Sequence, residues 1–141
     1  MAETQTLPAL LSRVESGEGE DRELDADLWI ALCSEKMRSD KFWGWRGIQA
    51  KGITDRPEAE VHRDFALRHA PPITSFLDAV IAMVERVKPG AGYRIEWHPQ
   101  ESSLRAWATC GPPGEQEAAY APTPARALLA ALIKAKLMEE Q

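Results

Sequence analysis

Two short segments, residues 93–98 and 104–109, alternate apolar and polar residues, and this pattern constrains the fold more than any other part of the chain. Alternation with a period of two puts successive side chains on opposite faces of a β-strand. Each segment therefore predicts a strand with one apolar and one polar face. The apolar face would carry Tyr93, Ile95, Trp97, Leu104, Ala106 and Ala108.

The two strands can pair as an antiparallel hairpin, and their polar residues favour one register. In that register Trp97 lies opposite Leu104. An opposite-charge pair and a cation–π pair then form on the polar face, and each contributes about 0.2–1 kcal/mol. A slip of one residue would lose both pairs and mix the two faces, so we predict this register. The two pairs are Glu96 with Arg105 and Arg94 with Trp107.

Two clear helix patterns flank this hairpin. Residues 75–78, Ser-Phe-Leu-Asp, fit a capping box, and Pro89-Gly90 would end the helix that they begin. The last helix would begin with Thr123 as its cap and Pro124 in its first turn. A Gly-Pro-Pro-Gly turn precedes residues 115–121, which we expect to add an edge strand. The apolar stripes of the two helices are Leu77, Val80, Ile81, Val84 and Val87, and Leu128, Leu129, Leu132, Ile133 and Leu137.

The first third of the chain predicts a helical hairpin. Thr6 would cap a helix that runs to about Ser16, and Gly17 suits a left-handed stop. A second helix would begin at Asp21 with an acidic first turn, which favours the positive end of a helix. Its apolar stripe is Leu24, Leu28, Ala31 and Leu32. Residues 34–70 show no periodicity that decides between helix and strand.

These elements predict an α+β fold. Strands joined by short turns make an antiparallel sheet of about three strands, and the two flanking helices can lie on its apolar face. A chain of 141 residues is long enough for one core and too short for two large domains. We therefore expect a single domain over 1–141, with a helical hairpin (1–33), an irregular basic and aromatic segment (34–70) and a helix, three-strand, helix unit (71–141).

The charge and composition narrow the classes of function. The formal net charge is −5, and residues 36–56 form the one basic patch, with six basic and two acidic residues. This balance argues against a protein that coats nucleic acid over its whole surface. No run of 18 apolar residues occurs and the first residues do not fit a signal peptide, so we expect a cytoplasmic protein without membrane contact.

Neither a catalytic nor a metal site is predicted. The three histidines, His62, His69 and His98, have no zinc-ligand spacing, and Cys33 and Cys110 form no CxxC pair. We interpret both cysteines as small buried groups. The acidic run over residues 18–27 favours the start of a helix and a solvated face. No phosphate-binding glycine loop occurs, so no cofactor is expected.

The candidate binding residues are aromatic and basic: Lys41, Trp43, Trp45, Arg46 and Trp107. Aromatic side chains that lie among basic residues can stack on unpaired nucleobases, while the lysine and arginine side chains contact the phosphates. The same aromatic and basic residues can also anchor a protein interface. They can equally cover the sheet or the helical hairpin. These three interpretations stay open. Of the two binding interpretations, we favour a protein partner over nucleic acid, and we keep a homo-oligomer open.

Three segments resemble one family. They are residues 10–13 (LLSR) with 21–26 (DRELDA), residues 72–79 (PITSFLDA), and residues 121–128 (APTPARAL) before an alanine-rich helix. Together they resemble the small proteins of tailed bacteriophages and prophages grouped as the phage ABA sandwich domain. The resemblance covers about residues 7–33 and 71–138, and departs from the family at Ile73, where an aromatic residue is expected. It implies an α–β–α sandwich with no established activity, so no catalytic residue is carried over.

The sequence therefore predicts a non-enzymatic accessory protein of a phage or prophage in the bacterial cytoplasm. It would act through contact with a phage or host protein. The alternative is a nucleic-acid-binding module that uses the basic and aromatic patch at residues 36–56.

Overall fold

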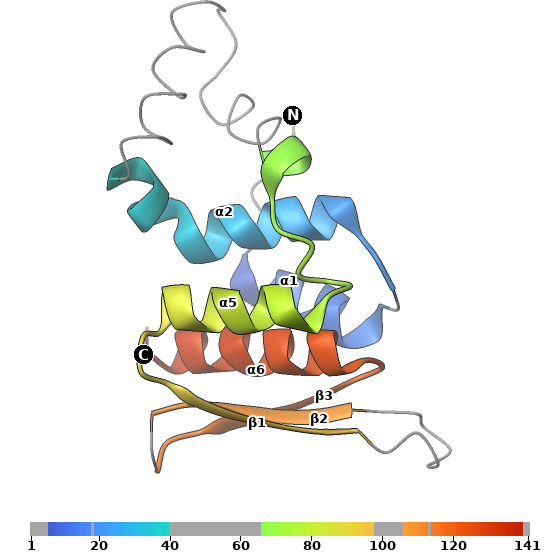
Figure 1. Ribbon diagram of the computed structural model, residues 1–141, viewed down its shortest axis with the longest axis vertical. Helices are drawn as coiled ribbons and strands as arrows, with labels where there is room; N and C mark the ends of the chain where they lie inside the picture. The colour runs from blue at the N-terminus through green and yellow to red at the C-terminus, as the bar shows by residue number, and fades with distance from the viewer. Residues whose placement is uncertain (1–5, 18, 40–65, 98–105, 113, 140–141) are drawn as a thin grey trace, which may run out of the picture.

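The computed structural model describes residues 6–17, 19–39, 66–97, 106–112 and 114–139. Within them the chain forms helices and one antiparallel sheet, so the predicted α+β class is confirmed. Figure 1 shows the labelled helices stacked on one side of the sheet. In chain order the elements are α1 (Leu7–Ser16), α2 (Arg22–Ser39), α5 (Leu77–Val87), β1 (Gly92–Trp97), β2 (Ala106–Gly111), β3 (Glu117–Ala121) and α6 (Pro124–Glu139).

The sheet has the order β1-β2-β3, so the predicted third strand lies at an edge as expected. The hairpin register differs from the predicted one by two residues, because Trp97 pairs with Ala106. The predicted pairs of Glu96 with Arg105 and Arg94 with Trp107 are therefore wrong. The reason is that β2 continues to Gly111, two residues beyond the predicted end, and brings the buried Cys110 into the sheet. A shift of two preserves the faces, so each described side chain keeps its predicted side.

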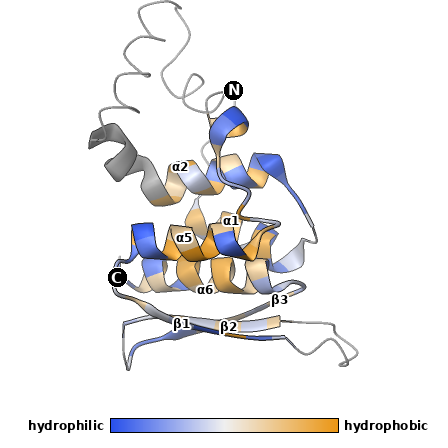
Figure 2. Ribbon diagram, in the orientation of Figure 1, coloured by the Kyte–Doolittle hydropathy of each residue, from blue (hydrophilic) through white to orange (hydrophobic). Residues whose placement is uncertain are grey.

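Helix α6 lies at the centre of the core. It packs directly on β2 and β3, and it also contacts α1 and α5. The strand residues beneath it are small, so the helix can approach the sheet closely; they are Ala106, Ala108, Ala119 and Ala121, all buried. Figure 2 shows strong hydrophobic colouring on α5 and α6, which lie between α2 and the sheet.

The N-terminal hairpin adds to the helical side of the molecule. Helix α1 packs against α6 and touches β3, while α2 packs against α1. In Figure 1, α2 lies on the far side of the helical layer from the sheet. The described residues thus place their helices on one face of the sheet, and the helix layer that the resemblance implies for the opposite face is not among them.

The helix ends confirm the predicted cap at Thr123, and Asp21, which was predicted as the first residue of the second helix, caps that helix. Asp21 Oδ1 accepts a hydrogen bond from the Leu24 amide at 3.0 Å, and Thr123 Oγ1 accepts one from the Arg126 amide at 3.2 Å. The predicted capping box is wrong, because α5 begins after Phe76 and makes no side-chain cap bond. Thr6 precedes α1 but also makes no side-chain cap bond.

Candidate interaction surface on the outer face of the sheet

Four of the five candidate binding residues, Lys41, Trp43, Trp45 and Arg46, lie outside the described residues. Trp107 is described. It lies at the second position of the central strand β2, between the inward-facing Ala106 and Ala108. Strand alternation therefore turns Trp107 away from α6, onto the face that we call the outer face of the sheet.

The outer face has an aromatic pair at its centre. Trp107 pairs with Glu96 of β1 on one side and with Tyr120 of β3 on the other. Trp107 is half-buried, whereas Tyr120 is 55% exposed. Directly opposite side chains of an antiparallel pair stand about 4.5–5.5 Å apart at their Cβ atoms, so Trp107 and Tyr120 are neighbours on the outer face.

A charged pair borders the aromatic pair. The Arg94 guanidinium donates to the Glu96 carboxylate at 2.8 Å, along the same face of β1. Both side chains are solvated, and their ion pair adds little to stability. An aromatic centre with a charged rim is the usual composition of a protein contact surface. This composition follows from the sequence alternation, because Trp107 and Tyr120 alternate with alanines that face α6.

The outer face also holds an unsatisfied hydroxyl. Thr109 pairs with Arg94 on one side and Ala118 on the other, and only 8% of its surface is exposed. Its Oγ1 atom is buried and has no hydrogen-bond partner in the described structure. An unsatisfied buried hydroxyl costs about 1–3 kcal/mol. Among the described residues, the Thr109 hydroxyl therefore contributes no hydrogen bond to the central strand.

The inner face is only partly covered at β1. Helix α6 lies mainly over β2 and β3, and its contact with β1 is smaller. Ile95 packs against the core, but Tyr93 is 41% exposed and Trp97 is 58% exposed on the same face. Strand β1 is also an edge strand of the sheet. Among the described strands, β1 therefore forms an edge that presents two exposed aromatic side chains.

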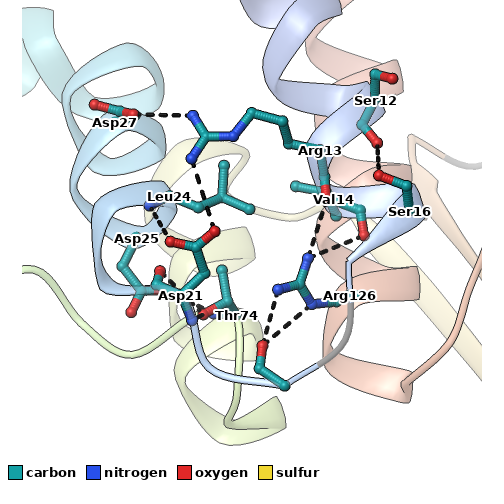
Figure 3. Close-up of polar contacts among 11 residues, drawn as sticks. Ser12, Arg13, Val14, Ser16, Asp21, Leu24, Asp25, Asp27, Thr74 and Arg126 are labelled. Atoms are coloured by element: carbon teal, nitrogen blue, oxygen red, sulfur yellow. Dashed lines mark hydrogen bonds and ion pairs between the residues drawn. The ribbon is translucent and has the colours of Figure 1, made fainter.

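A separate polar cluster joins the N-terminal hairpin to the rest of the fold (Figure 3). At its centre is Arg126, in the first turn of α6, with 1% of its surface exposed. Its guanidinium donates to the carbonyls of Arg13 and Val14 in the last turn of α1, at 3.1 and 3.3 Å. It also donates to the Gly19 carbonyl, at 2.8 Å from Nη2. Arg126 thus places a positive charge at the negative end of α1 and satisfies its terminal carbonyls.

Arg126 also explains Gly17, which the sequence predicted as a left-handed stop. Gly17 has a φ of −88°, so this prediction is wrong. A Cβ atom on Gly17 would lie 2.5 Å from Arg126 Nη1, well inside contact distance. Glycine is therefore needed here for the close approach of the guanidinium and not for a positive φ.

The second half of the cluster holds Asp25, which is fully buried. Its carboxylate accepts a hydrogen bond from the Thr74 amide at 2.8 Å and one from Arg22 at 3.0 Å. Thr74 in turn accepts from the Asp21 amide at 2.9 Å. Burial raises the pKa of Asp25, while the Thr74 and Arg22 contacts act against this rise.

Sequence reasoning missed the burial of both charges. The acidic run was interpreted as a solvated face, and for Asp25 this is wrong. The available signal was helical spacing, because Asp25 lies beside Leu24 and precedes Leu28 by three residues and Trp29 by four. For Arg126 the signal was its position in the first turn of a helix, where a positive charge is unfavourable next to the positive end of the helix dipole. Such a charge indicates a compensating partner in another segment of the chain.

The cluster has the features of a structural contact that holds the N-terminal hairpin against the rest of the fold. Its charges bind backbone groups and each other across three segments of the chain that are distant in sequence. The described residues contain no group of three or more His, Cys, Asp or Glu side chains that could hold a metal ion. Among them, no helix is long and apolar enough to cross a bilayer. Cys110 is buried as predicted, and burial raises its pKa; His98 and the side chain of Cys33 lie outside the described residues.

Comparisons with family models, with curated proteins and with solved structures found no match for this chain.

Proposed function

We propose that this chain is a non-enzymatic accessory protein of a bacteriophage or prophage that binds another protein through the outer face of its sheet. The observation that carries the contact surface is the cross-strand pair of Trp107 and Tyr120 on a face that no described helix covers. Tryptophan and tyrosine supply large contact areas and are enriched among residues that dominate binding energy.

The chemistry of the surface defines the partner. A protein that presents an apolar side chain to the aromatic pair, with charged groups around it, would match the Arg94 and Glu96 rim. The non-enzymatic part is supported by the buried polar cluster, whose charges are engaged with backbone carbonyls and amides. The phage part is supported by the resemblance of the three segments described above.

The test is capture from bacterial cells that carry the phage or prophage, with a photo-crosslinking residue placed at Ala118 beside Thr109. Trp107→Ala should abolish the cross-linked product. Phe76→Ala is the matched control, because Phe76 is 61% exposed and precedes α5, away from the sheet. A product that Trp107→Ala does not change would contradict the proposal.

The same experiment separates protein contact from nucleic-acid binding. The sample is treated with nuclease and then washed at rising salt before cross-linking. A protein contact centred on aromatic rings should survive both treatments. A product that nuclease removes, and that weakens steeply with salt, would overturn the protein-contact proposal in favour of binding to nucleic acid.

A further inference from the structure

Strand β1 has a sequence that is complementary to itself. Around Ile95, its residues read Tyr93, Arg94, Ile95, Glu96 and Trp97. Positions one residue from Ile95 carry opposite charges, and positions two residues away are both aromatic. When a second copy of the strand runs in the opposite direction, each charge therefore faces the opposite charge and each aromatic residue faces another aromatic residue. This is the complementarity that two identical strands need to pair in antiparallel orientation.

The position of β1 makes that pairing accessible. Strand β1 forms one edge of the sheet, with β2 on its other side. Tyr93 and Trp97 are 41% and 58% exposed on the inner face, beside the half-buried Ile95. An open edge with exposed aromatic side chains is a template for pairing with another strand. In the part of the chain that the structure describes, no strand pairs with this edge.

We propose that two copies of this chain join through β1 and form a symmetric dimer with a two-fold axis at Ile95. The two sheets then become one continuous antiparallel sheet. Ile95 lies opposite its own copy, Arg94 lies opposite Glu96 of the second copy, and Tyr93 lies opposite Trp97. The intrachain Arg94–Glu96 pair becomes part of a ring of four alternating charges on the outer face.

Charge selects this register over its neighbours. A slip of two residues in one direction puts Arg94 opposite its own copy, and a slip of two in the other direction puts Glu96 opposite its own copy. Like charges directly opposite each other are destabilising. A slip of one residue turns the helical side of one copy towards the outer face of the other. Only the axis at Ile95 matches both the charges and the faces.

The surface area that the two β1 strands would bury predicts a weak dimer. A buried aromatic side chain covers about 150–250 Å², and about half of this remains exposed at each of the two β1 aromatics. With a strand of six residues, the contact lies at the small end of specific interfaces, below about 1,200 Å² in total. We therefore expect association that depends on concentration, with a dissociation constant in about the micromolar range or above.

This dimer does not rest on the proposed function, because its contacts exclude Trp107 and Tyr120. It extends that function by joining two outer faces into one surface. The two proposals can therefore fail separately. Trp107→Ala removes the partner contact and leaves the dimer, whereas a change at Ile95, which packs on the helical side of the sheet, removes the dimer and leaves the outer face in place.

The test uses charge reversal and sedimentation of the full chain over a wide concentration range. Arg94→Glu makes the four axis charges acidic, and Glu96→Arg makes them basic. Each change alone should weaken self-association by about tenfold or more. Mixing the two variants in equal amounts should restore a dimer that contains one copy of each. Circular dichroism and thermal unfolding confirm that each variant is folded.

Three results would overturn the dimer. They are a wild-type chain that stays monomeric at millimolar concentration, self-association that both single reversals leave unchanged, and folded variants that do not combine when mixed.

A second variant keeps the test independent of charge. Ile95→Cys in a Cys33→Ser background puts two thiols at the axis, where oxidation should link two chains by a disulfide. Ala118→Cys in the same background is the control on the opposite edge strand and should give little linked product. Equal yields from the two positions would contradict an axis at Ile95.

Discussion

The guanidinium of Arg126 occupies the space in which a side chain on Gly17 would begin. A Cβ atom there would lie 2.5 Å from Nη1 and 2.9 Å from the guanidinium carbon. The two residues are more than a hundred positions apart in the sequence, yet the arginine side chain leaves room only for glycine at position 17. Through this contact the last helix anchors the end of the first helix, so the N-terminal hairpin is attached to the core by a buried charge.

This relationship predicts that Gly17→Ala is strongly destabilising. The new methyl group displaces the guanidinium and weakens its bonds to the Arg13, Val14 and Gly19 carbonyls. We expect a loss of about 2–4 kcal/mol in the free energy of unfolding, measured with urea. Gly90→Ala is the control: Gly90 has a φ of +83° in open space, so its cost of about 1 kcal/mol comes from the backbone alone.

The coupling between the two residues is measured by a double-mutant cycle. In an Arg126→Ala background the clash is absent, so Gly17→Ala should cost about 1–3 kcal/mol less than it does in the wild type. Gly90→Ala should cost the same in both backgrounds. Equal costs of Gly17→Ala in the two backgrounds would show that the guanidinium does not require glycine at this position.

Thr109→Val should leave the protein as stable as the wild type or more stable by about 1 kcal/mol. The valine keeps the branched shape and strand preference of threonine, and it removes the buried hydroxyl that lacks a hydrogen-bond partner. Thermal unfolding of the two proteins checks this. A clear loss of stability in the valine variant would mean that the hydroxyl has a favourable contact after all.

Asp25 should make stability depend on pH. Burial raises the pKa of Asp25 above its ordinary value of 3.8, so the folded protein retains a proton that the unfolded chain has already lost. The contribution of Asp25 to stability therefore falls as the pH rises from about 3.8 through the folded pKa.

Asp25→Asn removes this titration and keeps an oxygen that can accept the Thr74 amide. Urea unfolding from pH 3 to pH 7, with pH steps of about one unit, should show the asparagine variant gaining stability relative to the wild type as the pH rises. Other carboxylates affect both proteins alike and cancel in the difference. A difference that stays constant across this range, or that moves the other way, would contradict a raised pKa.

The thiol of Cys110 should be unreactive in the folded protein. It is fully buried beneath α6, and burial raises its pKa, so little thiolate forms at neutral pH. In a Cys33→Ser background, a thiol reagent should label Cys110 only when the protein unfolds. Labelling at the rate of a free thiol, without denaturant, would place this position outside the core.

The sequence was sufficient for elements whose pattern is local. The alternation around Ile95, the Thr123-Pro124 start and the alanine-rich helix each predicted the observed element. The register was wrong by two residues because cross-strand charge pairs are weak, whereas the burial of Cys110 extends β2. The predicted capping box at Ser75 is wrong, because α5 begins one residue later and the Ser75 hydroxyl donates to the Pro72 carbonyl at 3.4 Å.

The buried polar cluster could not be predicted from local pattern. Arg126 and Gly17 become neighbours only when α1 packs against α6, and Asp25 meets Thr74 across a long separation in the chain. The candidate surface was predicted in part. Trp107 falls on the face that alternation assigns to it, while its pairing with Tyr120 required the position of β3.

The central claim is that the outer face of the sheet is open to solvent, and hydroxyl-radical footprinting of the isolated protein tests it most directly. Two methionines calibrate the experiment: Met138 is 53% exposed and Met83 is 3% exposed. We predict that Tyr120 is oxidised readily in the folded protein, as Met138 is, while Met83 is oxidised only on unfolding. Protection of Tyr120 to the level of Met83 would show that the outer face is covered, and the proposed contact surface could not exist.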